Sequence, residues 1–462
     1  MARNHTASFT VSDTPAYNSG NALQYEDSGE GKWHQPDSPD NDINEKLLNE
    51  STSSLTIKRS ECYQAEQEAS SVVVAVRVRP LFSREIHTGC KNIVSIIDNE
   101  AVILLDPMLS HHDDVLRINR SREKNFVFDC AFSANCNQQT VFAKTTKLLL
   151  EGVIQGLNAT IFTYGATGTG KTYTMFGDSE QPGIMMLTLQ DLFDRLSAQQ
   201  AEKSFQISAS FLEIYNENIR DLLQPKSDYL EIREEPERGM SVAGAVEIPL
   251  KSTSDFMHLL SNGNQQRTQE PTEANLTSSR SHAVLQVTVQ GRLQCSGVDE
   301  QIHIGKLSMI DLAGSERAAQ TKNRGLRMIE GANINRSLLA LGNVINALAE
   351  RSKNRKGVFV PFRDSKLTRL LKDSLGGNCK TMMIANISPS HVAYEDTHNT
   401  LKYAYRTKSI KSKVVRNVVN INYHIARYTQ VIEELRAEIM GLKSKLAMAQ
   451  NEVPQKISCF YL

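Results

Sequence analysis

The sequence predicts an α/β protein whose central, mostly β sheet is flanked by helices on both faces. Short apolar runs rich in β-branched residues alternate along the chain with segments of helical periodicity. One run, residues 159–164, leads directly into the pattern G-x-x-x-x-G-K-[ST] at residues 165–172, the phosphate loop of nucleoside triphosphatases. Strands that alternate with helices, with a phosphate loop at one strand-to-helix turn, are typical of an α/β fold.

Each expected element follows from a local pattern. Apolar runs predict strands at residues 72–80, 159–164, 205–214, 283–293 and 304–311. Apolar residues at helical spacing predict helices at residues 140–155, after Lys171, and at residues 219–223, 327–351, 365–374 and 397–409. The main folded region is therefore expected to begin near Ser71.

The first 70 residues differ from the rest in composition. They contain 12 acidic and 5 basic residues, with repeated Ser, Asn, Asp, Gly and Pro. Such a segment cannot bury enough apolar surface to fold, so it is predicted to be a disordered acidic and polar extension. The remaining residues include 47 basic and 40 acidic side chains, a mild excess that suits an anionic partner.

Residues 421–450 carry a different repeat. Apolar residues return at alternating intervals of four and three, namely Ile421, Ile425, Tyr428, Ile432, Leu435, Ile439, Leu442, Leu446 and Ala449. This spacing predicts a short coiled coil of about four heptads, through which residues 421–449 of two chains would form a weak homodimer. The alternative is an amphipathic helix docked on its own domain, because the seam is short.

Cysteine usage and hydropathy exclude several classes of protein. The 7 cysteines show no C-x-x-C spacing, which argues against a zinc site or a disulfide framework. No window approaches about 18 uninterrupted apolar residues, and the start of the chain lacks an apolar signal region. We therefore expect a cytosolic protein with no membrane span.

The phosphate loop specifies the chemistry of the site. Its glycines allow the backbone to curl, so that successive N–H groups face the β- and γ-phosphate oxygens. Lys171 adds a positive charge, and Thr172 offers a hydroxyl ligand for magnesium. The chain is therefore predicted to bind a nucleoside triphosphate.

Two further segments suit a sensor of the γ-phosphate. Residues 311–316 follow an apolar strand, so Asp311 would hold a magnesium-bound water and Gly314 would offer a backbone N–H to the γ-phosphate. Residues 275–282, Asn-Leu-Thr-Ser-Ser-Arg-Ser-His, combine several hydroxyls with one guanidinium. Taken alone, this second segment is more typical of an ordinary polar turn.

Together these motifs resemble the nucleotide site of the kinesin motor domain. The resemblance rests on the phosphate loop with its flanking tyrosines and on residues 275–282 and 311–316, in that order. Residues 77–80, 212–217, 333–338 and 363–369 also match, so the resemblance covers about residues 71–415. Residues 106–107, 120–124 and 267–272 are most similar to the kinesin-8 class, especially its ciliary branch.

The resemblance implies ATP and Mg²⁺ as cofactors and a role for each site residue. Adenine would be framed by Arg77, Arg79, Pro80 and Tyr173. The phosphates would be wrapped by Gly165, Ala166, Thr167, Gly168, Thr169, Gly170, Lys171 and Thr172. Magnesium would lie near Thr172 and Ser279, with Asp311 holding one of its waters. The catalytic groups would be Ser278 and Gly314, which position the attacking water, and Arg280 and Glu316, which pair to relay the proton. Asn335 would connect the following helix to these switches.

Basic residues in the second half would form the track-binding surface. They are Lys322, Arg324, Arg327, Arg336, Arg351, Lys353, Arg355, Lys356, Arg363, Lys366 and Arg369. The resemblance places them against microtubules, whose tubulin is acidic, so that charge would speed and orient docking. Nucleic acid is the competing polyanion, but the basic run lacks interleaved aromatic residues for base stacking. We therefore expect microtubules and no nucleic acid as partners.

The resemblance divides the chain into five parts. These are the extension (1–70), a kinesin motor domain (71–408), a neck linker (409–420), the short coiled coil (421–450) and a C-terminal tail (451–462). Thr407 stands where kinesins usually have Ala, so docking of residues 410–417 is expected to be less secure.

The function implied is a microtubule-stimulated ATPase motor in the cytoplasm, on the microtubule cytoskeleton, with the cilium as a further location suggested by the class. Movement toward the plus end and depolymerisation of microtubule ends are also implied by the class. The alternative is an atypical, non-processive protein that binds microtubule ends and turns over ATP slowly. A small-molecule kinase is disfavoured, because it would not need the basic helices after Asp311.

Overall fold

The structure is a computed structural model. It describes residues 68–109, 122–178, 180–199, 203–224, 228–235, 239–268, 280–293, 301–316, 326–353, 357–420, 429–430 and 432–445, and the side chains of 68–70, 109, 268, 293, 326–335 and 420 lie outside this description. All of these residues belong to the unit Gln64–Leu462, whereas the unit Met1–Tyr63 and with it most of the predicted extension fall outside. In the described residues, no helix has the length and apolar character needed to cross a membrane.

A mixed sheet forms the centre of the fold. In the described part of the chain it has 10 strands, in the order β12-β8-β13-β14-β7-β15-β2-β6, with β9 beside β8 and β17 beside β14. Their bounds are β2 Val73–Val78, β6 Cys130–Phe132, β7 Ala159–Tyr164, β8 Lys203–Tyr215, β9 Asn218–Asp221, β12 Ile248–Leu250, β13 His282–Leu293, β14 Gln301–Asp311, β15 Lys380–Ile387 and β17 Val418–Asn420. Pairing is parallel from β14 to β6 and antiparallel from β12 to β14. The parallel strands β7 and β15 bury nearly every side chain, as their continuous apolar runs require.

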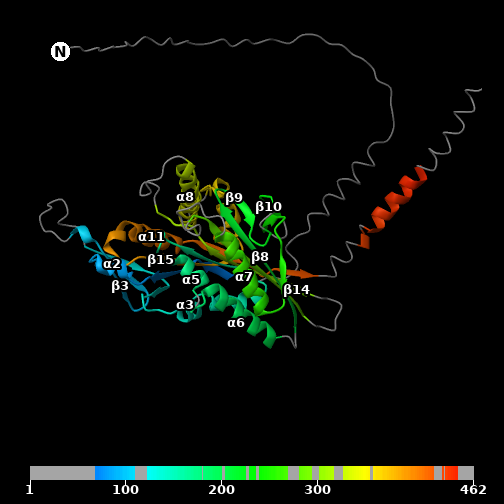
Figure 1. Ribbon diagram of the computed structural model, residues 1–462. Helices are drawn as coiled ribbons and strands as arrows, with labels where there is room; N and C mark the ends of the chain where they lie inside the picture. Colours follow the sequence, from blue (N-terminus) through cyan, green and yellow to red (C-terminus); the bar gives the residue numbers. More distant parts are fainter. Residues whose placement is uncertain are drawn as a thin grey trace, which may run out of the picture. The chain divides into compact units, whose positions relative to one another are not determined.

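Helices cover both faces of this sheet, as Figure 1 shows. One cluster of buried apolar residues joins the sheet to α8, α9, α10 and α11, and the other joins it to α3, α4, α5, α6 and α7. The bounds are α2 Ser83–His87, α3 Gln138–Lys144, α4 Lys147–Ile154, α5 Lys171–Phe176, α6 Ile184–Ala198, α7 Thr253–Thr268, α8 Leu326–Ser352, α9 Lys366–Leu370, α10 Lys372–Gly376 and α11 Tyr394–Thr407. The predicted α/β class, with helices on both faces of a central sheet, is confirmed.

Three smaller sheets complete the described structure. Strands β3 Val94–Ile97, β4 Ala101–Leu105 and β5 Glu123–Val127 form one, and the hairpin of β10 Glu231–Glu235 and β11 Gly239–Ala243 forms another. The third pairs β1 Glu68–Ser71 with β16 Lys411–Val414. Sequence periodicity predicted none of these short, partly exposed strands.

The helix predicted at residues 219–223 is wrong, because residues 218–221 form strand β9. Tyr215 pairs with Asn218 across a two-residue turn, and the turn residues Asn216 and Glu217 both have positive φ. Positive φ at both positions is the backbone of a tight hairpin. An apolar run this short fits a strand and a helix equally well, so only the turn before it decides the outcome.

Two other helix predictions are correct in type but merge separate helices. The segment 140–155 divides into α3 and α4, because Thr145 leaves the helical conformation with φ −123° and ψ −94°. The segment 365–374 divides into α9 and α10 around Leu371. The strands predicted near β2, β7, β8, β13 and β14 and the helices near α5, α8 and α11 are present within a few residues of the expected bounds.

The segment after α11 lies along the sheet. Strand β16 pairs antiparallel with β1, and β17 pairs with the first three residues of β14. Between them, the Asn417 N–H donates to the Gly156 carbonyl at 2.9 Å, and the Ile304 N–H donates to the Asn417 carbonyl at 3.0 Å. Thr407 is fully buried and its hydroxyl donates to the Tyr403 carbonyl. The predicted neck linker is thus hydrogen-bonded to the sheet although Thr407 departs from the usual Ala.

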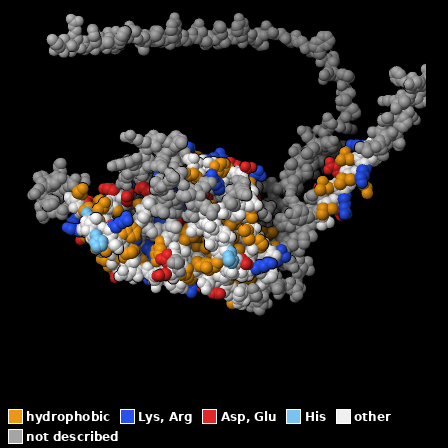
Figure 2. All heavy atoms as spheres, viewed as in Figure 1, with side chains coloured by type: hydrophobic (Ala, Val, Ile, Leu, Met, Phe, Trp, Pro, Cys, Tyr) orange, Lys and Arg blue, Asp and Glu red, His pale blue; other side chains and the backbone are white. Residues whose placement is uncertain are grey.

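Residues 432–445 are helical, and all of their side chains are exposed. Figure 2 shows apolar and basic side chains displayed together on this helix. Four of the predicted seam residues, Ile432, Leu435, Ile439 and Leu442, are about half exposed. The remaining seam positions lie outside the described residues, so the coiled coil stays a prediction.

Candidate nucleotide site

The candidate site lies where the parallel strands of the sheet end. Strand β7 passes through residues 165–170 into α5, and β14 ends at Asp311, which pairs with Thr163 of β7. Carboxyl ends of neighbouring parallel strands meet at one edge of a sheet, where ligands bind in open α/β folds. The topology therefore brings Asp311 to the phosphate loop, as the sequence predicted.

Two loop glycines have conformations or surroundings that exclude a side chain. Gly165 has φ +151°, and a Cβ there would lie 2.2 Å from the Asn386 carbonyl oxygen. Gly170, with φ +91°, is the residue directly before α5. The loop can therefore turn tightly against β15 and present its backbone at the N-terminus of α5.

Lys171 is buried beneath the loop. Its Nζ donates to the Ala166 carbonyl at 3.0 Å, and only 6% of the residue is exposed. Burial lowers the pKa of this ammonium from its ordinary value, while the nearby Asp311 and Glu316 carboxylates oppose that change. A desolvated ammonium interacts strongly with phosphate charge because no bulk water screens it.

Asp311 is held by three donors from different elements, one of which is the Thr163 hydroxyl of β7, which donates to Oδ1 at 3.2 Å. Its Oδ2 accepts from the Thr172 hydroxyl at 2.8 Å and from the Arg267 guanidinium at 2.9 Å. The Arg267 and Asp311 side chains are both fully buried, so this is an ion pair shielded from water. Arg267 also donates to the Ser281 carbonyl at 2.9 Å and thereby joins α7 to the motif at residues 275–282.

Arg267 is a functional residue that sequence reasoning missed. The sequence indicates it only as part of the class-specific segment 267–272, not as a partner of Asp311. Nothing in its local pattern, at the end of a polar helix, distinguishes it from a solvated arginine. Only the tertiary structure reveals the buried pair.

Glu316 reaches the phosphate loop from the segment after β14. Its carboxylate accepts from the Thr167 N–H at 2.8 Å and from the Thr167 hydroxyl. The Ser315 N–H donates to the Gly165 carbonyl at 3.1 Å. A Cβ on Gly314 would lie 2.1 Å from the Thr167 hydroxyl, so only glycine allows this close approach.

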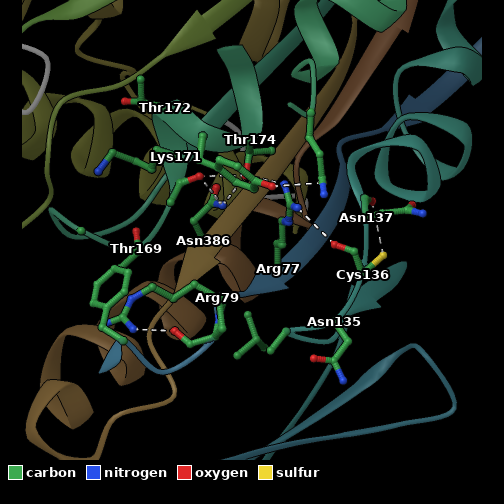
Figure 3. A pocket seen from close by; sticks show the side chains of 18 of the residues that line it. Arg77, Arg79, Asn135, Cys136, Asn137, Thr169, Lys171, Thr172, Thr174 and Asn386 are labelled. Atoms are coloured by element: carbon green, nitrogen blue, oxygen red, sulfur yellow. Dashed lines mark hydrogen bonds between the residues drawn. The ribbon is translucent and has the colours of Figure 1, made fainter. Parts of the chain in front are cut away.

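A cavity of about 580 Å³ opens beside the loop, lined by residues 77–80, 134–137 and 167–174 together with Phe82, Gln181 and Asn386. All four predicted adenine-framing residues, Arg77, Arg79, Pro80 and Tyr173, line it. Figure 3 shows Arg77 beside Asn386 and Cys136. The Arg77 guanidinium donates to the Gln138 and Thr174 side chains at 2.7 and 3.0 Å, which fixes its position.

Asn386 and Phe82 are cavity residues that the sequence did not indicate. The Asn386 side chain donates to the Thr174 hydroxyl at 2.8 Å. The Arg79 guanidinium lies 3.9 Å from the centre of the Phe82 ring and donates to the Glu85 carboxylate. Asn386 comes from a segment that has no nucleotide motif, and Phe82 lies two residues after the matching segment 77–80.

His282 connects the site to α8. Its Nδ1 accepts from the Ala313 N–H at 3.1 Å, so its Nε2 carries the proton and donates to the Ser337 hydroxyl at 2.8 Å. Complete burial and the neighbouring Arg267 and Lys171 lower the pKa of His282 to about 3, which keeps the ring neutral. The Asn335 side chain, predicted to make this connection, is not among the described side chains. Ser337 of the same helix connects α8 to His282 instead.

Several predicted residues are not placed in the site. Ser278 and Ser279 lie outside the described residues. Arg280 is half-buried in the turn that precedes β13. The catalytic and metal roles of these three residues stay predictions.

The predicted basic face is described only in part. Arg336, Arg351, Lys353 and Arg363 are exposed. Lys366 instead pairs with Glu231 of β10 at 2.6 Å. The residues before α8, the side chain of Arg327 and residues 355–356 lie outside the described part.

The site residues fit a nucleotide with magnesium. Among the lining residues, the Arg79 Nε and the Asn386 Oδ1 are buried without a protein partner, leaving one donor and one acceptor for a ligand such as a purine. Thr172 and Asp311 supply the hard oxygen atoms that Mg²⁺ prefers beside phosphate and water. Arg267 already occupies one side of the Asp311 carboxylate, which favours contact with the ion through a water.

A phosphate loop between a parallel strand and a helix, at the edge of the sheet where Asp311 also ends its strand, is the arrangement typical of the nucleoside triphosphatase class. A family profile described as Kinesin motor domain matches residues 77–410. The chain belongs to the kinesin motor domain family.

Individual relatives define the class. The chain is 53% identical over 381 residues to Kinesin-like protein KIF19 of Xenopus laevis, aligning 82% of this chain with 38% of that protein. It is 45% identical to Kinesin-like protein KIN-8B of Arabidopsis thaliana, over 85% of this chain and 47% of that protein. These matches confirm the similarity to the kinesin-8 class. The chain spans less than half the length of these curated relatives.

A solved structure supports the fold. A KIF14 dimer with AMP-PNP in complex with a microtubule is similar with a TM-score of 0.68 and 36% sequence identity. The likeness covers 75% of this chain and 96% of that one.

Proposed function

We propose that this chain is an ATPase motor whose turnover is stimulated by microtubules. The observation that carries the proposal is the meeting of three groups at one edge of the sheet: the buried Lys171 ammonium, the Thr172 hydroxyl and the Asp311 carboxylate. The last two lie 2.8 Å apart. Phosphoryl transfer depends mainly on positioning and charge neutralisation, and this arrangement supplies both. The KIF14 relative, bound to AMP-PNP and a microtubule, supports the choice of ligand and partner.

Lys171, Asp311 and Glu316 have different roles in the proposed hydrolysis. Bound ATP with Mg²⁺ would supply the scissile phosphoanhydride and the cation that offsets charge as the bond breaks. Lys171 neutralises phosphate charge in a desolvated setting, where such interactions are strong. Asp311, whose position is fixed by Thr172 and Arg267, orients a water molecule by accepting a hydrogen bond from it. Glu316, now bonded to Thr167, lies close enough to the loop to receive a proton from the attacking water.

A chain of contacts supports communication between this site and the microtubule face. His282 joins Ala313, next to Gly314, to Ser337 of α8. The neighbouring Arg336 and Leu339 are exposed on the same helix. A shift of the segment after β14 would therefore act on α8 directly. We propose that the exposed basic residues of α8 and of the loop after it bind acidic tubulin, with strong salt dependence.

A gliding assay tests this function. The purified chain is fixed to a surface, and polarity-marked microtubules are added with ATP or, as a control, with ADP. We expect gliding with ATP but not with ADP. The motor should move toward the plus end of the microtubule, and phosphate release should rise with microtubule concentration. A folded chain whose ATP turnover does not change when microtubules are added would contradict the proposal. Binding or end-shortening without gliding would favour the alternative, a non-processive end-binding protein with slow turnover.

Arg280 and Glu316 are proposed to act as one unit in catalysis, together with Ser278 and Gly314. Arg280→Ala and Glu316→Ala should each stop hydrolysis while nucleotide still binds. The double variant should lose little more than either single variant, because residues that work together are non-additive. Additive losses in this cycle would show that the two side chains act separately.

Pairing of two chains through residues 421–449 is proposed from the exposed apolar stripe of the helix 432–445. Sedimentation at tens of micromolar should detect a weak dimer, because a short seam buries little surface. Leu435→Asp should abolish it, whereas Glu433→Lys, off the stripe, should not. A chain that is monomeric at these concentrations would favour the docked-helix alternative.

Shortening of microtubule ends is proposed to depend on the basic residues of segment 106–124. At the described end of the segment, the Tyr394 hydroxyl donates to Asp106 at 2.8 Å, and Lys124 lies 3.6 Å from the same carboxylate. Neutralising Arg117, Arg120, Arg122 and Lys124 should reduce end-shortening far more than gliding. Equal loss of end-shortening and gliding, or no loss of either, would reject a dedicated role of these residues in end-shortening. Localisation to microtubules in the cytoplasm, and in the cilium, belongs to the same proposal.

A further inference from the structure

A second cavity lies at the opposite end of β14 from the nucleotide site. It measures about 280 Å³ and is lined by Ile154, Gln155, Lys203, Gly291, His303 and Arg416. His303 and Asp311 are eight residues apart on one strand, which corresponds to about 26 Å at roughly 3.3 Å per residue. The cavity is therefore separate from the nucleotide site, and the proposed function does not use its residues.

The cavity exists because one strand position has no side chain. Gly291 of β13 pairs directly with His303 of β14, so nothing from β13 covers the imidazole. A Cβ on Gly291 would also lie 2.9 Å from the Phe205 ring. The space is about half the volume of the nucleotide cavity and lies at the lower end of the roughly 300–1,000 Å³ typical of small-molecule sites, so a compact ligand fits it best.

Three basic side chains from three different segments border this space. Lys203 begins β8, His303 lies near the start of β14, and Arg416 belongs to the segment between β16 and β17. The Arg416 guanidinium donates to the Gln155 side chain at 3.2 Å, and Gln155 in turn donates to Glu151 at 2.8 Å. Among the described residues, no ion pair joins Lys203 or Arg416 to a carboxylate, and Glu151 lies 3.6 Å from Arg195 instead.

The imidazole has an unused polar atom. The Nδ1 of His303 is buried and makes no hydrogen bond to any of the described residues, whereas the ring bonds to the backbone of Gln155. Burial, opposed by that backbone bond, and the nearby Lys203 and Arg416 lower the pKa of His303. An anion in the cavity would offset the positive charges of Lys203 and Arg416. It would also accept a hydrogen bond from Nδ1 when the His303 ring is protonated.

We propose that Lys203, His303 and Arg416 form a binding site for a small oxyanion of the phosphate class, and that the bound oxyanion holds residues 415–420 against the sheet. The second part follows from the position of Arg416. It directly precedes Asn417, whose backbone bonds Gly156 and Ile304, and β17, which pairs with β14 at His303. An anion that contacts Arg416 together with Lys203 would add a bridge between this segment and the sheet.

Hydrogen exchange of the full chain tests the proposal without microtubules or ATP turnover. Amide exchange of residues 415–420 is followed with increasing inorganic phosphate, and with chloride at equal ionic strength as the control. At ten times its dissociation constant, phosphate should slow this exchange by about tenfold. No slowing, or the same slowing with chloride, would overturn the site.

Charge variants locate the effect. Lys203→Gln and Arg416→Gln should each remove most of the phosphate effect, whereas Lys413→Gln, at an exposed lysine of the preceding strand β16, should retain it. Phosphate that slows exchange equally in all three variants would be acting elsewhere, for example at the phosphate loop, and would also overturn the proposal.

The role of His303 has its own readout. Sulfate serves as the probe because its charge does not change between about pH 6 and pH 8, the range in which histidine titrates. The oxyanion raises the depressed pKa of His303, so binding takes up a proton and affinity should rise as the pH falls. His303→Gln should flatten this dependence. A flat profile in the unmodified chain would overturn the three-residue site.

Discussion

The two ends of strand β14 are built in different ways. At Asp311 the strand meets a buried ion pair, a hydroxyl and a buried ammonium, all in fixed positions. At His303 it meets backbone hydrogen bonds from the linker segment and partly exposed basic side chains. A buried charge is costly unless every partner is in place, whereas exposed backbone pairing opens and closes at low cost. The comparison teaches that one strand has a rigid end at the nucleotide site and a more weakly held, releasable end at residues 415–420.

The largest expected effect is at the rigid end. Lys171→Ala should lower microtubule-stimulated phosphate release by about a hundredfold to a thousandfold, because a desolvated cation at the phosphates is lost. The exposed Lys147→Ala provides a control with the same change of charge. Near-normal turnover in a folded Lys171→Ala chain would show that this end is not the catalytic one.

Arg267→Ala tests whether the rigid end depends on its buried pair. The substitution leaves the Asp311 charge uncompensated, and unfolding in urea should show a loss of about 3–5 kcal/mol. Adding Asp311→Asn should recover part of this loss, because the buried charge is then removed. Arg195→Ala, which breaks a partly exposed pair with Asp191, should cost less than about 1 kcal/mol. Equal losses for the two arginines would show that burial does not make the Arg267 pair more important than an exposed one.

Asn417→Ala probes the releasable end. The two N–H donors of the Asn417 side chain are shared among three oxygen atoms, those of Gly156, Asn158 and Ile304, at 2.9 to 3.1 Å. Losing these bonds, each contributing about 1 kcal/mol, should speed amide exchange of residues 415–420 by about tenfold or more. Basal ATP turnover should change little. A loss of ATP turnover in this variant would show that the two ends of β14 depend on each other.

The rigid end should also give stability a gradual dependence on pH. His282 has a depressed pKa of about 3 in the folded chain, so between about pH 6.5 and pH 3 the unfolded chain binds the extra proton. Stability from this residue is therefore present above pH 6.5 and is lost as pH falls, with a slope of up to about 1.4 kcal/mol per pH unit. His282→Gln should flatten the slope, whereas His258→Gln, at an exposed position, should not. Equal slopes for both variants would contradict a buried neutral His282.

Sequence predicted the rigid end well, because phosphate binding uses short contiguous motifs. Residues 165–173, Asp311, Gly314 and Glu316 do converge at one edge of the sheet. Arg267 and Asn386 escaped prediction, since each comes from a distant segment and acts only through tertiary contact. The class and fold are confirmed, whereas the roles of the site residues, including Ser278, Ser279 and Arg280, stay predictions.

The releasable end is harder to predict. Strands β1, β16 and β17 are three to four residues long, and such runs carry too little periodicity to identify. The same limit explains why the sequence predicts a helix where β9 forms. Strand β15 escapes prediction although it lies at the centre of the sheet, because methionine and alanine replace the β-branched residues that favour a strand.

One feature of the nucleotide cavity offers a chemical handle. Of the four cysteines in the described residues, Cys136 alone lines the cavity, and it is partly exposed, whereas Cys379 is buried. Burial raises the pKa of the Cys136 thiol, so it is a slow nucleophile toward reagents in bulk solution. A purine analogue that carries a mild electrophile would hold its reactive carbon beside this sulfur and alkylate it in preference to the other described thiols. Covalent labelling could thus report occupancy of the base pocket in a mixture of proteins.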